Sequence, residues 1–317
     1  MTTEPQFPRI ALIGLGLIGS SIARAVRQLG LAGELVVTDA SPEVRARAVE
    51  LQLGHRVADT NADAVTDADL VIACVPVGIC AKVAQDIGGH LKPGAIVSDV
   101  GSVKGSVLRA MAPHLPQTVH FIPAHPVAGT ENSGPDAGFA ELFINRWCIL
   151  TPPEGADTAA VERLTVFWRT LGANVEVMTA EHHDLVLAVT SHLPHLIAYT
   201  IVGTADELED VTRSEVLKFS AGGFRDFTRI AASDPTMWRD VFLSNKDAVL
   251  EMLGAFQEDL SKLTRAIRRG DGEVLFDQFT RTRAIRRGIV NLGQETASPD
   301  FGRPHAPLPK TDDETDE

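Results

Sequence analysis

The chain has 317 residues and a formal net charge of −13, with 44% hydrophobic and 22% charged residues. This length allows two domains with cores of their own, and the composition is typical of a soluble globular protein. The negative charge argues against nucleic acid or an anionic membrane surface as a partner of the whole molecule.

Targeting and cysteine signals predict a cytoplasmic protein. The apolar stretch 10–22 is similar to the middle of a signal peptide, but it holds three regularly spaced glycines and no plausible cleavage site follows it. No other run of about twenty apolar residues is evident, so we expect no membrane span. Cys74, Cys80 and Cys148 lack metal-ligand spacing and lie among apolar residues, as is typical of core thiols in a reducing compartment.

The first half of the chain alternates short apolar runs with stretches of helical spacing. The predicted strands are Arg9–Ile13, Leu35–Thr38, Leu70–Cys74, Ala95–Asp99, His120–Ala124, Trp147–Leu150 and Asn174–Met178. The predicted helices are Ser20–Leu29, Pro42–Leu51, Ile79–His90 and Thr158–Leu171. Near-continuous apolar strands separated by helices predict an α/β domain over residues 1–178, with a parallel sheet covered on both faces.

Strand patterns stop near residue 179. Long stretches of helical spacing follow, such as Leu185–Val202 and Asp247–Arg268, and they predict an all-helical domain over residues 179–294. Residues 295–317 are proline-rich and then acidic, which predicts a disordered tail.

The hexapeptide RAIRRG occurs twice, at Arg265–Gly270 and at Arg283–Gly288. We interpret each copy as the end of a helix, where cations suit the helix dipole and glycine suits the left-handed turn. The alternative is that these arginines bind anions or form an interface.

The sequence GLGLIG lies between the first predicted strand and a helix. Gly14 allows the tight turn, Gly16 lets the backbone approach a pyrophosphate, and Gly19 permits close packing of the helix on the strand. The N–H groups that begin the helix, including those of Leu17 and Ile18, can bind phosphate together with the positive end of the helix dipole. The pattern predicts a Rossmann domain that binds a dinucleotide.

Asp39 ends the second predicted strand. A carboxylate in this position accepts hydrogen bonds from ribose hydroxyls and repels a 2′-phosphate, which favours NAD over NADP. The alternative for Asp39 alone is that it caps the helix that begins after it.

Polar side chains are expected at the carboxyl ends of the parallel strands, where ligands bind in an open sheet. The sequence SDVGSVKG follows a predicted strand and places Ser102 and Lys104 at this rim, and His125 follows the next strand. Ser102 is explained equally well as a helix N-cap. The alternative for His125 is a structural hydrogen bond, which its position at a strand terminus disfavours.

The helical half contains the sequence TSHLPHLIAY. Ser191 and His195 are four residues apart and share a helix face. Pro194 removes a helix hydrogen bond, so we expect a kink beside them. No third ligand lies at helical spacing on that face, so no metal site is expected here.

Two arginines, Arg225 and Arg229, lie one turn apart after a Gly-Gly pair. They either pair with local acids such as Asp226 or bind a substrate carboxylate in a bidentate fork. The spacing alone does not choose between these roles.

The motifs GLGLIG, DVGSVK, HPVAGTE, SHLPH and GGFRDFTRIAASDPTMWRD occur in this order and together resemble the prephenate/arogenate dehydrogenase family, over roughly residues 10–294. The resemblance implies a Rossmann domain, a helical domain that binds substrate and forms a homodimer, and oxidative decarboxylation with NAD(P)+. No regulatory amino-acid-binding domain or fused mutase follows Gln294, so we expect a stand-alone dehydrogenase.

The resemblance also implies residue roles. His125 matches the catalytic histidine, and Ser102 matches the serine that hydrogen-bonds the substrate hydroxyl and that histidine. Arg229 matches the arginine that binds a substrate carboxylate, and His195 matches a histidine near the substrate side chain. The positions matched to the lining or gate of the pocket are Thr130, Glu131, Ser191, His192, Trp238 and Arg225, the last replacing a lysine of some family members.

Two other classes of protein share some of these features. A β-hydroxyacid dehydrogenase also joins a Rossmann domain to helices, and Asn245 and Lys246 superficially fit it, but HPVAGTE and SHLPH do not. A non-catalytic NAD(H)-sensing regulator is disfavoured by the charge of −13 and by the lack of a recognisable DNA-binding unit.

Overall fold

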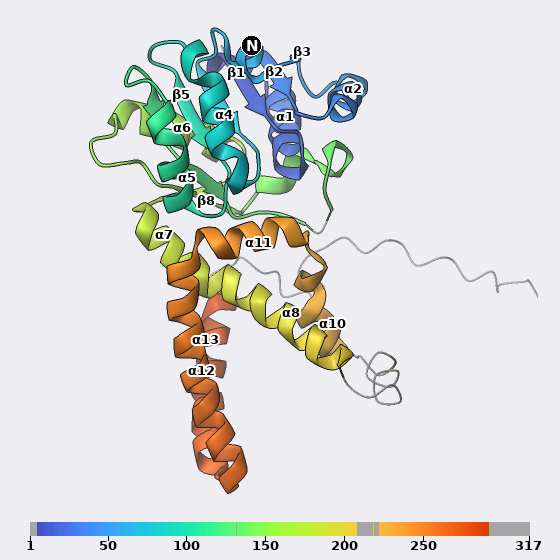
Figure 1. The fold of residues 1–317 in the computed structure, drawn as a ribbon, viewed down its shortest axis with the longest axis vertical. Coiled ribbons are helices and arrows are strands. Elements are labelled where there is room, and N and C mark those ends of the chain that lie inside the picture. Colours follow the sequence, from blue (N-terminus) through green and yellow to red (C-terminus); the bar gives the residue numbers. More distant parts are fainter. Residues whose placement is uncertain (1–4, 131, 208–217, 219–221, 292–317) are drawn as a thin grey trace, which may run out of the picture. The chain divides into compact units, whose positions relative to one another are not determined.

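The structure, a computed structural model, describes residues 5–130, 132–207, 218 and 222–291 (Figure 1). Its main sheet has six parallel strands in the order β3-β2-β1-β4-β5-β6, which confirms the predicted Rossmann architecture. The strands are β1 (Phe7–Ile13), β2 (Ala32–Thr38), β3 (Arg56–Val57), β4 (Leu70–Ala73), β5 (Ile96–Asp99) and β6 (His120–Phe121). The prediction missed only the two-residue strand β3 in this sheet.

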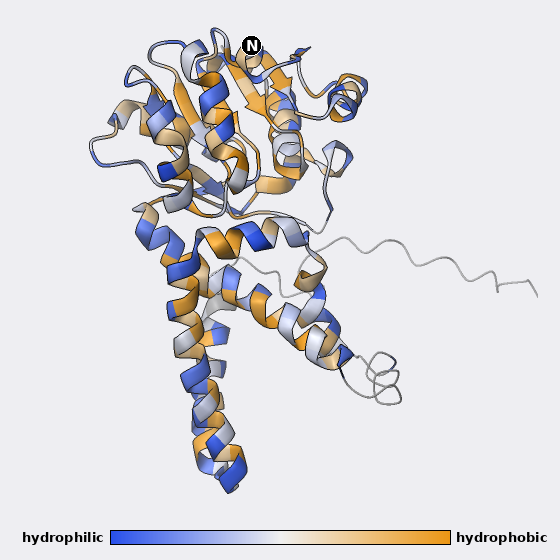
Figure 2. Ribbon diagram, in the orientation of Figure 1, coloured by the Kyte–Doolittle hydropathy of each residue, from blue (hydrophilic) through white to orange (hydrophobic). Residues whose placement is uncertain are grey.

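Helices cover both faces of the main sheet because alternate strand residues point to opposite sides. Ile10 and Leu12 belong to the core beneath α1 (Leu17–Leu29) and α6 (Thr158–Thr170). Ala11 and Ile13 belong to the core beneath the helices of the other face. The helices of that face are α3 (Asn61–Val65), α4 (Cys80–Ile87) and α5 (Lys104–Met111). Apolar residues accordingly gather on the central strands (Figure 2).

The predicted strand His120–Ala124 is wrong as one element. It divides at Pro123 into β6 and β7 (Ala124–Pro126), since proline has no N–H to continue a sheet ladder. β7 instead pairs antiparallel with β8 (Trp147–Leu150), which pairs parallel with β9 (Asn174–Val177). The second half of the domain is therefore a separate three-stranded mixed sheet, and the expectation of one parallel sheet is corrected.

After β9 the described chain is helical. Its elements are α7 (Ala180–Leu187), a π-helical turn η6 (Ala188–His192), α8 (Leu193–Asp206), α10 (Gly222–Thr228), a 3₁₀ turn η7 (Arg229–Ala232), α11 (Pro235–Ser244), α12 (Lys246–Arg269) and α13 (Gly272–Asn291). The remaining helix is α2 (Pro42–Glu50), and the 3₁₀ turns are η1 (Val77–Ile79), η2 (Gly88–His90), η3 (Ala112–His114), η4 (Pro135–Ala137) and η5 (Ala140–Phe143). The π-helical turn lies where Pro194 predicted a kink.

The chain forms two compact units, residues 1–255 and 256–317, and the candidate active site lies in the first. In the second unit the two RAIRRG copies differ. The first ends α12, and Gly270 adopts the left-handed φ of 68°. The second lies inside α13, so its predicted glycine cap is wrong. The predicted tail 295–317 lies outside the described residues.

The helical stretch Ala180–Asp206 is long and apolar enough to cross a membrane by length and composition, with a mean hydropathy of 1.6 in its most apolar window. This finding qualifies the expectation from the sequence that no such run exists. It is weak evidence for a span, because helices at cores and interfaces satisfy the same test.

Candidate active site

The glycine loop between β1 and α1 has the geometry that a dinucleotide requires. Gly14 has a φ of 93°, and a Cβ on it would lie 2.4 Å from the carbonyl oxygen of Cys74. A Cβ on Gly19 would lie 2.0 Å from the carbonyl oxygen of Gly14. At Gly16 a Cβ would meet nothing within 4 Å, so space is open at the start of α1. The loop thus fits a pyrophosphate at the helix N-terminus, beside the half-exposed Leu17 and Ile18.

Asp39 is held beside this loop. Its carboxylate accepts hydrogen bonds from the backbone N–H of Leu15 (2.8 Å) and of Ser41 (2.9 Å). The N-cap of α2 is Ser41, whose Oγ accepts from the N–H of Val44. Capping of α2 is therefore not the role of Asp39, and its half-buried carboxylate lies where the adenosine ribose binds in Rossmann domains.

His125 lies in the middle of β7, and two buried side chains hold the backbone of the preceding residue, Ala124. The Asp99 carboxylate accepts from the N–H of Ala124 (3.2 Å), and Lys104 Nζ donates to the Ala124 carbonyl (2.6 Å). Asp99 and Lys104 also form an ion pair in which both side chains are fully buried. Lys104 is thus a structural cation beneath the site, and its predicted place at the rim is wrong.

Ser102 is half-buried in the turn before α5, but it is not the N-cap, because that position is Val103. The Asp184 carboxylate, from α7, caps this helix instead. It accepts the N–H of Lys104 at Oδ1 (2.8 Å) and that of Gly105 at Oδ2 (2.9 Å). The capping explanation for Ser102 is therefore excluded, and α7 is docked onto the turn that carries Ser102.

The sequence interpretation missed the partners of His125. His125 Nδ1 lies 2.8 Å from His183 Nε2, and His183 Nδ1 lies 2.8 Å from Asp184 Oδ1. His183 is fully buried and His125 is 8% exposed. The available signal was the polar pair His183-Asp184 directly before the apolar run 185–187, since polar groups that become buried need partners.

The helical residues of SHLPH lie around Trp238 of α11. The His195 ring stacks on the Trp238 indole with centroids 3.6 Å apart, and His195 Nδ1 donates to the Ser191 carbonyl. His192 is fully buried, and its Nδ1 accepts from the amide of Asn245 (3.1 Å). Asn245, which superficially fitted a hydroxyacid dehydrogenase, therefore holds helices together. It also donates to the Asp184 carbonyl.

Trp238 connects these helices to the nucleotide-binding domain, since it packs with Val103 and Val241 in one buried cluster. The residue after Ser102 is thus in contact with the helical wall of the site. Arg229, in η7, is exposed and lies close enough to His195 to affect its ionisation. Arg225 and Thr130 are exposed as well, and Glu131 lies outside the described residues.

Burial lowers the pKa of each histidine in this cluster. The pKa of His125 falls well below 6.5, through desolvation and then the nearby His183. Desolvation also lowers the pKa of His183 and of His195, and brings that of His192 to about 4. His125 is therefore neutral at pH 7 and able to accept a proton. Its titration is expected at a more acidic pH than the near-neutral value predicted from the sequence.

These histidines predict a loss of stability in mild acid. In the unfolded chain they regain an ordinary pKa near 6.5, so below that pH the unfolded state binds more protons than the folded state. At pH 5.5 the buried His192, whose pKa is about 4, costs about 1.4 kcal/mol of unfolding free energy, and His125 and His183 add losses of the same sign. Urea unfolding at pH 7.5 and 5.5 measures this, with the exposed His90→Gln variant as control. Equal stability at both pH values would contradict it.

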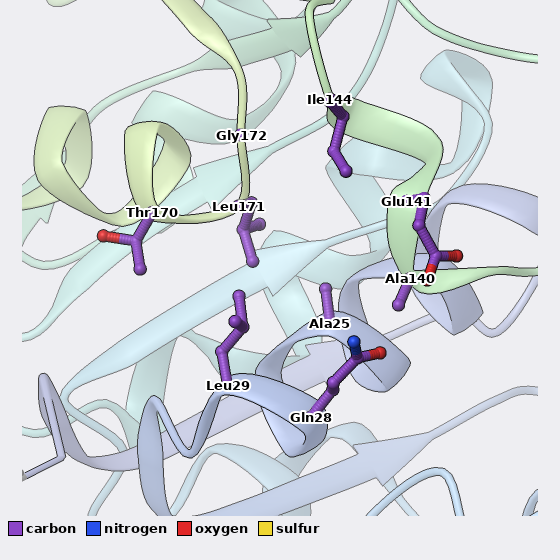
Figure 3. A pocket seen from close by; sticks show the side chains of 9 residues that line it. All are labelled: Ala25, Gln28, Leu29, Ala140, Glu141, Ile144, Thr170, Leu171 and Gly172. Carbon is purple, nitrogen blue, oxygen red and sulfur yellow. The ribbon is translucent and has the colours of Figure 1, made fainter.

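A hollow elsewhere on the nucleotide-binding domain lies between α1, η5 and the end of α6 (Figure 3). Apolar side chains such as Leu29, Ile144 and Leu171 line most of it, and none of the candidate active-site residues does. Within the described ranges, no group of three or more His, Cys, Asp or Glu residues is arranged to hold a metal ion.

The fold and site define a nucleotide-binding oxidoreductase with a buried histidine at the contact between its sheet and its helices. Residues 22–177 match the nucleotide-binding domain of prephenate dehydrogenase, and residues 179–281 match its dimerization domain. The chain belongs to the prephenate dehydrogenase family.

Individual relatives agree with this assignment. The chain is 46% identical to a cyclohexadienyl dehydrogenase of Zymomonas mobilis, over 89% of this chain and 96% of the relative. It is 35% identical to a prephenate dehydrogenase of Bacillus subtilis, over 92% of this chain and 78% of the relative. A crystal structure of Aquifex aeolicus prephenate dehydrogenase with hydroxyphenyl propionate and NAD+ superposes with a TM-score of 0.84, at 32% identity, covering 90% of this chain and 100% of that one.

Proposed function

We propose that this protein catalyses the oxidative decarboxylation of prephenate, arogenate or both, with NAD+ as oxidant, giving 4-hydroxyphenylpyruvate or tyrosine. The main support for this proposal is the environment of His125. This residue is neutral at pH 7, and β7 holds it where the helical residues of SHLPH meet the nucleotide-binding domain. Relatives named for this activity align over nearly the whole chain.

The residues present suit this chemistry. When bound, NAD+ supplies the hydride acceptor, and the open space at Gly16 fits its pyrophosphate. His125 Nε2 accepts the proton of the substrate hydroxyl as the carbonyl develops, and Ser102 hydrogen-bonds that hydroxyl. Loss of the ring carboxylate as CO₂ makes the ring aromatic, so no strong electron sink is needed from the protein.

Substrate binding is assigned to the helical residues. Arg229 binds a substrate carboxylate through its guanidinium fork, and His195 contacts the substrate side chain from its place on Trp238. The exposed Thr130 and Arg225 complete the pocket or its gate, together with Glu131, Ser191 and His192.

The test is formation of NADH from NAD+, and of NADPH from NADP+, with prephenate and with arogenate as substrates, followed at 340 nm. Turnover of either substrate supports the proposal. No NADH from either one, with a folded protein, would refute it and would favour a nucleotide-sensing role.

Cofactor choice is expected to depend on Asp39, with NAD+ preferred over NADP+. Asp39→Ala removes the acceptor for ribose hydroxyls and the repulsion of a 2′-phosphate, so the preference narrows by roughly tenfold, the value of one or two hydrogen bonds. The ratio of kcat/KM for the two cofactors measures it. Asp59→Ala, at a 95% exposed side chain nearby, is the control. Equal use of both cofactors by the unchanged protein would contradict the prediction.

We propose that the protein forms a homodimer through its helical domain. We also propose that it is cytoplasmic and that the boundary between its two domains lies near residue 178. The dimerization-domain match and large exposed apolar side chains support the homodimer, among them Phe276 (70% exposed) and Leu243 (69%). Light scattering at micromolar concentration is expected to give twice the chain mass of 34.0 kDa. A monomer at that concentration would refute the dimer.

A further inference from the structure

A chain of hydrogen bonds runs behind His125, away from the nitrogen that the proposed function uses. It passes from His125 Nδ1 to His183 Nε2 (2.8 Å) and from His183 Nδ1 to Asp184 Oδ1 (2.8 Å). We infer that His183 and Asp184 are positioning residues that set the tautomer of His125, so that its Nε2 carries no proton and faces the substrate hydroxyl as an acceptor. This inference rests on the proposed function of His125.

Asp184 is the proton acceptor at one end of this chain of hydrogen bonds. Its carboxylate already accepts two N–H groups from the start of α5, that of Lys104 at Oδ1 and that of Gly105 at Oδ2. A carboxylate surrounded by donors at a helix N-terminus acts as an acceptor. The proton between Asp184 and His183 therefore lies on His183 Nδ1.

His183 is the middle member of this chain of hydrogen bonds. Its ring is fully buried, and desolvation lowers its pKa, so it is neutral at pH 7. A neutral imidazole with a proton on Nδ1 presents a lone pair at Nε2. His125 must then donate its own proton from Nδ1, which leaves a lone pair on His125 Nε2.

The surroundings hold this arrangement in place. The two rings meet edge to face, with centroids 5.0 Å apart and an interplanar angle of 68°. Asn245 donates to the Asp184 carbonyl, and the Asp99–Lys104 pair fixes the backbone before His125. Among the described residues, Lys104 and His192 also lower the pKa of His125, and the buried Cys148 thiol contacts its backbone.

Two measurements test this inference: nuclear magnetic resonance of the His125 tautomer, and the effect of that tautomer on turnover. In protein labelled with ¹⁵N-histidine at pH 7.5, His125 is expected to show a protonated Nδ1 and an unprotonated Nε2, its signals being assigned by their loss in His125→Asn. In Asp184→Asn the side-chain amide can donate an N–H to His183 Nδ1. His183 then carries its proton on Nε2 and donates it to His125 Nδ1, so the His125 proton moves to Nε2. His183→Phe removes the acceptor and keeps a ring. Both variants are expected to shift the His125 signals.

Steady-state kinetics give the second readout. We expect kcat to fall on the order of a hundredfold to ten-thousandfold in Asp184→Asn, as for a misassigned histidine tautomer in a catalytic triad, with KM and NAD+ affinity nearly unchanged. His182→Phe, at the exposed neighbouring histidine of α7, should match the unchanged protein.

A protonated Nε2 on His125 in the unchanged protein would overturn the inference, even if the variants failed to fold. Folded variants with unchanged kcat and unchanged His125 signals would overturn it too. The nuclear magnetic resonance measurement needs no turnover, so a protein with the expected tautomer but no activity on prephenate or arogenate would refute the proposed function instead.

Discussion

His125→Asn is expected to lower kcat by roughly a hundredfold to ten-thousandfold with little change in KM, because a general base acts mainly in the transition state. Asparagine keeps a polar side chain of similar reach but has no nitrogen that accepts a proton near neutral pH. Steady-state kinetics with prephenate and saturating NAD+ measure the loss. The exposed His182→Asn change serves as the control.

The pH dependence of kcat provides a second test of His125 as the general base. Since burial lowers the pKa of His125 well below 6.5, kcat should stay level near neutrality and fall only as the pH drops through that lowered value, where the base becomes protonated. This acidic limb should vanish in His125→Asn. If it persists unchanged, another group titrates and His125 is not the base.

Arg229→Lys is expected to raise KM for prephenate strongly while leaving NAD+ affinity intact. A guanidinium binds a carboxylate through two parallel N–H groups, and an ammonium cannot reproduce that fork. If the contact is equally strong in the ground and transition states, kcat falls far less than in His125→Asn. The position of Arg229 near His195 places the cation beside the proposed substrate side chain.

The alternative for Arg229, a purely local partner such as Asp226, predicts a different result. In that case the variant would lose thermal stability and keep the KM of the unchanged protein. Melting temperature, NAD+ affinity and both kinetic constants should be measured on one preparation. Arg239→Lys is the matched control, because that arginine is 62% exposed on α11 and pairs with Asp240.

Local sequence was sufficient wherever the determining atoms are close in the chain. The glycine loop is an example, because the left-handed turn at Gly14 and the contact of Gly19 with the Gly14 carbonyl lie within six residues. The apolar strands of the main sheet were predicted for the same reason. The family motifs then located His125, Ser102 and Arg229 as candidates for the site.

Local sequence did not predict the structure where the same residue pattern can adopt two different conformations. RAIRRG ends α12 at Gly270, where a turn and Asp271 follow, but it continues through α13 at Gly288, where the apolar pair Ile289-Val290 follows. Serine is a residue type that often caps helices, as Ser102 could, yet Asp184 caps α5 from eighty residues further along the chain. Such competition between nearby and distant acceptors is decided by packing.

The arrangement behind His125 depends wholly on tertiary structure. His183 lies 58 residues away in sequence, and only the docking of α7 onto α5 brings its ring to His125 Nδ1. Lys104 looked like a rim residue because it follows the end of β5, but Asp99 and the Ala124 carbonyl bind its ammonium group in the interior. Buried polar groups must find partners, and the partners within reach are known only once distant segments have packed.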